Sequence, residues 1–113
     1  MVKNKNYIPD NGDIIWVNFN PIKGHEQSGR RPAVVVSPEA YNKKSGLVLI
    51  CPITSKIKGY PFEVMIEYEK IQGAVLVDQI RSVDWKERKI AYVSKADKEI
   101  DKEIKGKLIG IIS

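Results

Sequence analysis

The chain has 113 residues, 42% hydrophobic and 29% charged, a size and mixture that favour one folded domain spanning residues 1–113 and exclude a disordered chain. No apolar run is long enough to span a bilayer, and the amino-terminal run MVKNKNYIPDNG does not resemble a signal peptide, so we expect a cytoplasmic protein. The net charge of +5 favours an anionic partner, and the excess lies in residues 1–60, which hold nine Lys/Arg and four Asp/Glu.

Short apolar runs separated by turn signals such as Asn11-Gly12 and Ser45-Gly46 predict β-strands. In chain order the strands are expected at Asp13 to Phe19, Pro32 to Ser37, Leu47 to Thr54, Phe62 to Glu67, Ala74 to Ile80 and Ile90 to Val93. A short helical turn is expected at Pro38 to Lys44. The near-continuous runs AVVV and LVLI are typical of strands buried on both faces, which in so small a protein predicts a curled sheet or a barrel.

The last segment, DKEIDKEIKGKLIGIIS, changes to a helical period. Its apolar residues at that spacing are Ile100, Ile104, Leu108 and Ile111. We therefore expect an amphipathic helix packed on the sheet, with Ser94 and Asp97 capping its start. The expected fold class is mainly β with a C-terminal α-helix, in the form of a small β-barrel.

The chain contains a single cysteine, Cys51, and a single histidine, His25. One cysteine excludes an internal disulfide, and the pair offers no Cys/His cluster at zinc-ligand spacing. We therefore expect neither a metal nor another cofactor.

A polar loop, KGHEQSGRRP, separates the first two predicted strands. If the anionic partner is RNA, attack of a 2′-hydroxyl on the neighbouring phosphate needs a base, an acid, and positive charge facing the phosphorane. One histidine excludes a two-histidine acid/base pair within a subunit, so the loop predicts Glu26 as base and Arg31 as the group that stabilises the phosphorane. The same side chains also fit ordinary roles: a solvated Glu26, arginines in surface ion pairs, and a hydrogen-bonded His25.

Three segments of the chain resemble the MazF/PemK family of toxin endoribonucleases. They are GDIIWVNFNPIKGHEQSGRRPAVVVSPEAYN (Gly12 to Asn42), KGYPFEV (Lys58 to Val64) and VLVDQIRSVDW (Val75 to Trp85). The resemblance implies an SH3-like barrel of the MazF/CcdB type, a homodimer, and an acidic MazE-like antitoxin as partner. It also implies metal-independent cleavage of single-stranded mRNA to 2′,3′-cyclic phosphate and 5′-hydroxyl ends.

Matched position by position, the family's catalytic residues fall on Glu26, Arg31 and Thr54, and His25 takes the place of a helper found in some members. Other members use a later aspartate as base, with an arginine two residues before it. That aspartate falls on Asp78, but Leu76 stands where the arginine is required, so the resemblance favours Glu26 and Arg31.

Single-stranded RNA is held by positive charge along its backbone and by stacking or hydrogen bonding to its bases. The predicted substrate-binding residues are Lys23, Gln27, Arg30, Lys56, Lys58, Tyr60, Asp78, Gln79 and Arg81. For Asp78, Gln79 and Arg81 an internal ion pair or another structural role is the alternative.

Two other functions fit the same fold. One is a CcdB-like gyrase poison, a type that uses an aromatic residue in its carboxy-terminal tail, whereas this chain ends LIGIIS. The other is a non-catalytic nucleic-acid-binding barrel in which the basic half only holds phosphates. The polar loop and the tail favour the endoribonuclease.

Overall fold

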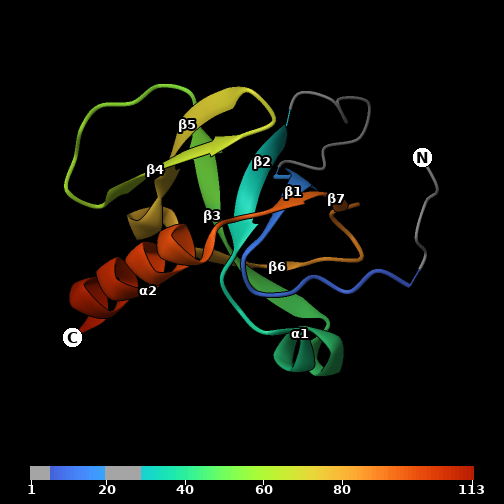
Figure 1. Ribbon diagram of the computed structural model, residues 1–113. Coiled ribbons are helices and arrows are strands. Elements are labelled where there is room, and N and C mark those ends of the chain that lie inside the picture. The colour runs from blue at the N-terminus through green and yellow to red at the C-terminus, as the bar shows by residue number, and fades with distance from the viewer. Residues whose placement is uncertain (1–5, 20–28) are drawn as a thin grey trace.

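The computed structural model describes residues 6–19 and 29–113 (Figure 1). In chain order the elements are β1 (Asp13–Asn18), β2 (Arg30–Val35), α1 (Glu39–Ser45), β3 (Leu47–Thr54), β4 (Glu63–Tyr68), β5 (Ile71–Leu76), the 3-10 turn η1 (Val77–Gln79), β6 (Arg81–Asp84), β7 (Ala91–Lys95) and α2 (Lys98–Ile112). Within those residues the strands form one antiparallel seven-stranded sheet in the order β4-β5-β3-β2-β1-β7, with β6 paired to β3.

The sheet curls into a half-barrel, with α2 packed against β4 and η1 and with α1 packed against β3 (Figure 1). This confirms the predicted class, a mainly β, SH3-like small barrel with a C-terminal helix. Among the described residues no helix is both long and apolar enough to cross a membrane.

Consecutive residues of β1 and β2 are buried on both faces of the sheet, as the apolar runs predicted. Ile14 and Val34 join a cluster that includes Ile104 of α2, whereas Ile15 and Val35 join a second cluster built with β3 and β6. Because side chains alternate along a strand, the two clusters hold the sheet from opposite sides.

The strand predicted at Ala74 to Ile80 is wrong in its second half, because β5 ends at Leu76 and the chain turns through η1. The turn buries Val77, whose N–H donates to the carbonyl of Phe62 at 3.3 Å, while the rest of η1 is exposed. Strand β6 was not predicted, because Val83 is its only buried residue and so short an alternation gives no clear signal.

Helix α2 buries Ile104 as predicted, but Ile111 is exposed. The predicted cap is wrong: Ser94 lies in β7, and Asp97 makes no side-chain capping hydrogen bond. The chain before α2 is instead held by the N–H of Ala96, which donates to the carbonyl of Gly12 at 2.8 Å.

Candidate active site

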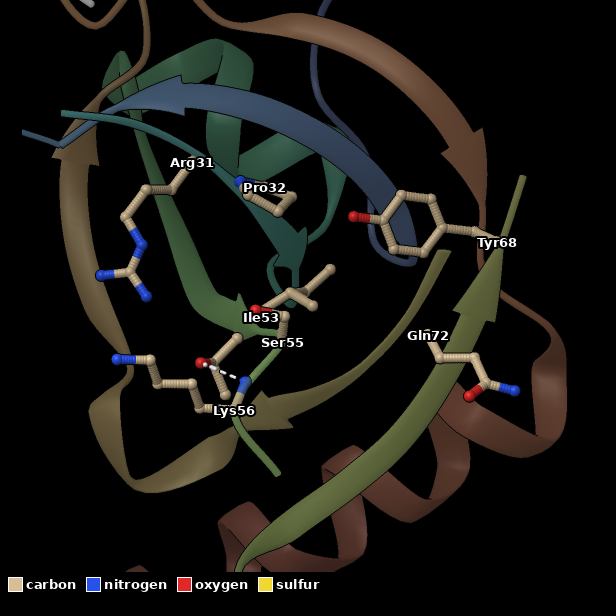
Figure 2. A pocket seen from close by; sticks show the side chains of 8 residues that line it. Arg31, Pro32, Ile53, Ser55, Lys56, Tyr68 and Gln72 are labelled. Atoms are coloured by element: carbon tan, nitrogen blue, oxygen red, sulfur yellow. Dashed lines mark hydrogen bonds between the residues drawn. The ribbon is translucent and has the colours of Figure 1, made fainter. Parts of the chain in front are cut away.

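A cavity of about 380 Å³ opens where the end of β3 meets β2 and the β4–β5 hairpin (Figure 2). It is lined by Arg31, Pro32, Ile53, Thr54, Ser55, Lys56, Tyr68 and Gln72. Its volume falls within the range of roughly 300 to 1,000 Å³ that is typical of small-ligand sites. Three residues predicted from the sequence, Arg31, Thr54 and Lys56, therefore lie at one site, although Arg31 is distant in the sequence from the other two.

Thr54 is the last residue of β3, where its backbone pairs with Ala74 of β5. The backbone N–H of Lys56 donates to Thr54 Oγ1 at 3.1 Å. No described residue accepts the Thr54 hydroxyl proton, so this proton remains for a ligand in the cavity. A hydroxyl both accepts and donates, and Thr54 thus presents a donor whose oxygen is already oriented.

Gly73 lets β5 approach Thr54 closely. A Cβ atom at this position would lie 2.7 Å from the Thr54 carbonyl oxygen and 3.0 Å from Cγ2 of Ile53. Only a residue without a side chain fits there without displacing backbone. The placement of Thr54 in the cavity therefore depends on a glycine in the neighbouring strand.

Two arginines from distant parts of the chain contact one aromatic ring. The guanidinium carbon of Arg31 lies 5.7 Å from the centroid of Phe19, and that of Arg81 lies 5.1 Å from it. Cation–π contact of this kind holds a guanidinium without using its hydrogen-bond donors. Neither arginine forms an ion pair within residues 6–19 and 29–113, so Arg31 keeps its charge for an anion.

Arg30 is separated from Arg31, its neighbour in the sequence. Its guanidinium carbon lies 5.6 Å from the ring of Trp16, and Arg30 does not line the cavity. Successive side chains of a strand point to opposite faces, which explains the separation. The structure therefore distinguishes the two adjacent arginines that the sequence presents as a pair.

The segment after Thr54 is held by a buried carboxylate. Glu63 accepts hydrogen bonds from the backbone N–H groups of Gly59, at 2.9 Å, and of Lys58, at 3.3 Å. Lys58 Nζ lies 5.9 Å from the ring of Tyr60, whose centroid is 5.2 Å from that of Phe62. Lys58 and Tyr60 are exposed and lie outside the cavity lining, so they belong to a neighbouring surface.

Asp78 and Gln79 are exposed in η1, away from the cavity lining. Burial raises the pKa of the Cys51 thiol to about 12, and the charge of Asp78 adds to this shift. Cys51 therefore stays protonated at neutral pH and is no nucleophile. Within the described part of the chain, no group of three or more His, Cys, Asp and Glu side chains is placed to hold a metal ion.

The chain matches a protein family over residues 10–112, and this family is described as PemK-like, MazF-like toxin of type II toxin–antitoxin system. The chain belongs to the PemK/MazF toxin family. It is 52% identical over 82 residues to endoribonuclease toxin MazF of Escherichia coli K12, covering 73% of this chain and 74% of that protein. It is also 36% identical over 109 residues to endoribonuclease toxin ChpB of the same strain, covering 91% of each.

Solved structures of the family share the fold. A crystal structure of MazF from Deinococcus radiodurans has a TM-score of 0.84 and 46% identity, covering 95% of this chain and 98% of that one. A MazE–MazF structure from the same organism has a TM-score of 0.83 and 41% identity, covering 96% and 98%. The expectation that the resemblance gave for family and fold is therefore confirmed.

Four residues predicted for the site, Lys23, His25, Glu26 and Gln27, lie outside the described residues. The described positions that flank them are joined, because the N–H of Phe19 donates to the carbonyl of Gly29 at 2.8 Å. Phe19, whose ring Arg31 and Arg81 contact, and Gly29 therefore lie next to each other.

Tyr68 and Gln72 line the cavity but were not predicted. The alternation Val64, Ile66, Tyr68 marks Tyr68 as a residue on the buried face of β4. Nothing in that pattern shows that its phenol edge reaches a cavity made by another strand pair. The family motif ends before Tyr68, so the resemblance gave no signal there either.

Proposed function

We propose that this protein is the toxin of a type II toxin–antitoxin system and a sequence-specific, metal-independent endoribonuclease that cleaves single-stranded mRNA. The observation that carries the proposal is the convergence of Arg31, Thr54 and Lys56 on one cavity, with neither cation in an ion pair within the described residues. Membership of the family and the similarity to two endoribonuclease toxins of E. coli support it.

In the proposed reaction, Glu26 takes the proton of a ribose 2′-hydroxyl and the 2′ oxygen attacks the adjacent phosphorus. The bond from phosphorus to the 5′ oxygen breaks, and that oxygen leaves after gaining a proton from a general acid. The products are a 2′,3′-cyclic phosphate and a 5′-hydroxyl. His25, next to Glu26, is proposed as a helper in these proton transfers.

The negative charge that develops on the phosphorane is met by Arg31 and Thr54. A guanidinium presents forked donors that match phosphate oxygens. The Thr54 hydroxyl accepts from the Lys56 N–H, and its own proton has no acceptor among the described residues. Removing one such donor typically costs roughly two to three orders of magnitude in rate. Lys56 adds positive charge at the same side of the cavity.

The remaining predicted contacts are proposed to hold the RNA on either side of the reacting phosphate. Arg81 stands beside Arg31 at Phe19, and Lys58 and Tyr60 form a basic and aromatic surface after Thr54. The other members of this proposed set are Lys23, Gln27, Arg30, Asp78 and Gln79. Single-stranded RNA bound in this way is held by charge and by stacking.

We further propose that residues 1–113 form one toxin domain that works in the cytoplasm as a homodimer. An acidic, MazE-like antitoxin is the proposed inhibitor, because this chain has a net charge of +5 and its structural neighbours include MazE–MazF structures.

The test is to incubate the protein with a long mixed-sequence RNA in excess EDTA and to map every new end. Discrete cuts with cyclic-phosphate and 5′-hydroxyl ends are expected, and Glu26→Gln should abolish them. Glu39→Gln, which removes an exposed carboxylate in α1, is the matched control and should cut normally. Intact RNA with the unaltered protein would contradict the proposal and favour the CcdB-like gyrase poison or the passive binder.

A further inference from the structure

Tyr68 lines the cavity and carries a hydroxyl that is unpaired within the described residues. The residue is 6% exposed, and within the described residues its phenol oxygen is buried without a hydrogen-bond partner. Figure 2 shows the ring entering the cavity from β4 with its hydroxyl directed toward Pro32. Buried polar groups are nearly always paired in native proteins, so an unpaired one facing a cavity indicates a ligand that supplies the partner.

The cavity has two chemically different sides. Arg31 and Lys56 offer positive charge on one side, and Tyr68 enters from the other (Figure 2). The Thr54 hydroxyl, which accepts from the Lys56 N–H, adds a donor to the lining. Pro32 and Ile53 provide apolar surface between the two sides. Charge and an apolar wall in one cavity suit a nucleotide, whose phosphate is anionic and whose base is flat and neutral.

The surroundings of Tyr68 disfavour a phosphate at its hydroxyl. Burial raises the pKa of Tyr68, and the charge of Glu69 raises it further, so the phenol stays protonated and neutral at physiological pH. Glu67, Glu69 and Lys70 are exposed on this hairpin, and their net charge of −1 disfavours an anion. Gln72 lies at the rim with its side chain directed away from the Tyr68 hydroxyl (Figure 2).

We propose that the Tyr68 hydroxyl hydrogen-bonds the nucleobase of a nucleotide next to the scissile phosphate and so helps to determine which RNA sequence is cut. This inference rests on the proposed endoribonuclease function. A phenol hydroxyl can donate or accept, so it pairs with a base edge that the apolar wall of Pro32 and Ile53 holds in plane. A site that hydrogen-bonds one base rejects bases that cannot make this bond, because its buried hydroxyl would then be left unpaired. Removing the hydroxyl should therefore weaken the discrimination between bases.

The experiment compares Tyr68→Phe with the unaltered protein on a randomised RNA library. Tyr68→Phe keeps the ring and removes only the oxygen, so its melting temperature should be unchanged or higher. We expect a relaxed preference at one position of the cut site, with kcat/KM on the preferred sequence reduced about tenfold and little change on other sequences. Tyr41→Phe, at an exposed tyrosine in α1, is the matched control and should leave the preference unchanged.

Each other result overturns the inference. An unchanged cut pattern with unchanged kcat/KM would make the phenol oxygen irrelevant to RNA. An equal loss on all sequences would place the hydroxyl on the sugar–phosphate backbone instead. If the unaltered protein cut no RNA, the proposed function would fail with this inference, whereas unaltered cleavage by Tyr68→Phe beside inactive Glu26→Gln would remove this inference alone.

Discussion

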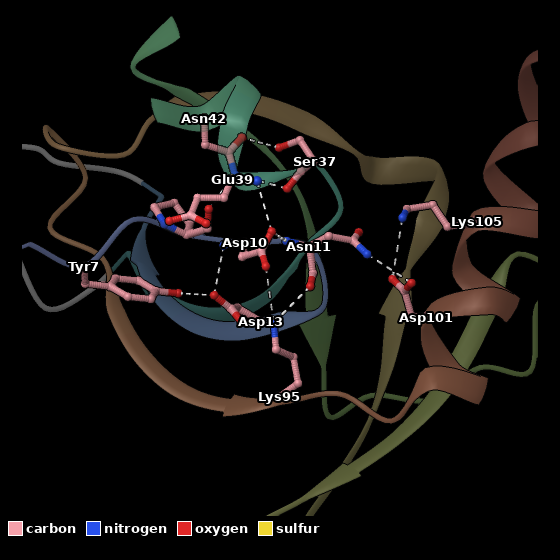
Figure 3. Close-up of polar contacts among 11 residues, drawn as sticks. Tyr7, Asp10, Asn11, Asp13, Ser37, Glu39, Asn42, Lys95, Asp101 and Lys105 are labelled. Atoms are coloured by element: carbon pink, nitrogen blue, oxygen red, sulfur yellow. Dashed lines mark hydrogen bonds and ion pairs between the residues drawn. The ribbon is translucent and has the colours of Figure 1, made fainter. Parts of the chain in front are cut away.

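Two polar regions of this molecule differ in whether their groups are paired. In the amino-terminal network (Tyr7, Asp10, Asp13, Ser37, Asn42 and Lys95), Asp13 accepts from the Tyr7 hydroxyl at 2.5 Å and from the Asp10 N–H at 2.9 Å (Figure 3). Lys95 Nζ lies 2.7 Å from Oδ1 of the same aspartate, Asp13. The cavity of Arg31, Thr54 and Tyr68 instead leaves a charge and two hydroxyls without protein acceptors or ion-pair partners among the described residues.

The buried side-chain amide of Asn42, in the same amino-terminal network, is also paired. Asn42, fully buried, donates to the carbonyls of Pro9 and Ser37 and accepts from the Ser37 hydroxyl. Such complete pairing stabilises the fold but offers nothing to a ligand. Asn11 Oδ1, beside this network, is also buried without a partner among the described residues. The candidate active site is therefore marked by unpaired polar groups that occur together with free positive charge at the lining of a cavity.

Among the described residues, the comparison predicts the largest loss of activity at Arg31. Arg31→Ala should reduce kcat/KM for RNA about 10² to 10³-fold, because a donor and a charge facing the phosphorane are removed. The melting temperature should change little, since Arg31 is exposed and a cation–π contact of an exposed cation contributes about 0.5 to 1 kcal/mol. Single-turnover cleavage and thermal unfolding measure the two effects.

Arg30→Ala is the control for that change, because it removes the same charge from the neighbouring residue on the opposite face of β2. A reduction of less than tenfold is expected. Equal losses in the two variants would mean that bulk charge, not the cavity, accounts for the effect.

The amino-terminal network should show the reverse pattern. Asp13→Asn is expected to lower the free energy of unfolding by roughly 2 to 3 kcal/mol, because a buried, charge-assisted set of hydrogen bonds loses its charge. Cleavage well below the melting temperature should be unchanged. Urea titration measures the change in stability, and the same cleavage assay measures the activity.

For this network the control is Asp97→Asn, at an exposed carboxylate without a side-chain capping bond, which should shift stability by less than about 0.5 kcal/mol. An Asp13→Asn protein that is stable but inactive would break the distinction between the two regions.

The last expected effect is on alkaline stability. Burial raises the pKa of Tyr7, and its hydrogen bond to Asp13 raises it further above the ordinary 10.0. For Lys95, burial lowers the pKa, but the hydrogen bond and charge of Asp13 outweigh this and raise it above 10.5. Both groups hold their protons more tightly in the folded protein than in the unfolded chain. Their contribution to the free energy of unfolding is therefore complete below about pH 10 and is lost as the pH rises further.

Urea unfolding between pH 8 and pH 11 measures this dependence. The free energy of unfolding should fall above pH 10, by up to about 1.4 kcal/mol per pH unit for each proton retained. Tyr7→Phe should make the decline shallower. A Tyr7→Phe protein with an equally steep decline would show that Tyr7 does not titrate on unfolding.

The sequence predicts those parts of the fold and site that depend on local pattern. Apolar runs gave β3 with its observed bounds, and the helical period gave α2. The end of β5 at η1 and the strand β6 were not predicted, because burial of Val77 and Val83 depends on packing between distant segments. Such contacts leave no periodic signal.

The candidate site divides in the same way. Arg31 was predicted both by chemistry and by resemblance, and Thr54 by resemblance alone. Their contact with one cavity, the shared ring of Phe19, and the entry of Tyr68 are consequences of strand curvature that no single segment contains. Strand geometry likewise places Arg30 and Arg31, neighbours in the sequence, at different surfaces.

The closeness of Gly73 to Thr54 has a genetic consequence. Every amino acid that one base change in a glycine codon can introduce carries a Cβ atom, and at this position that atom meets the backbone of the strand end. Cells that express the protein without an inhibitor and are selected for survival should therefore yield codon 73 repeatedly among their escape mutations, including substitutions as small as Gly73→Ala.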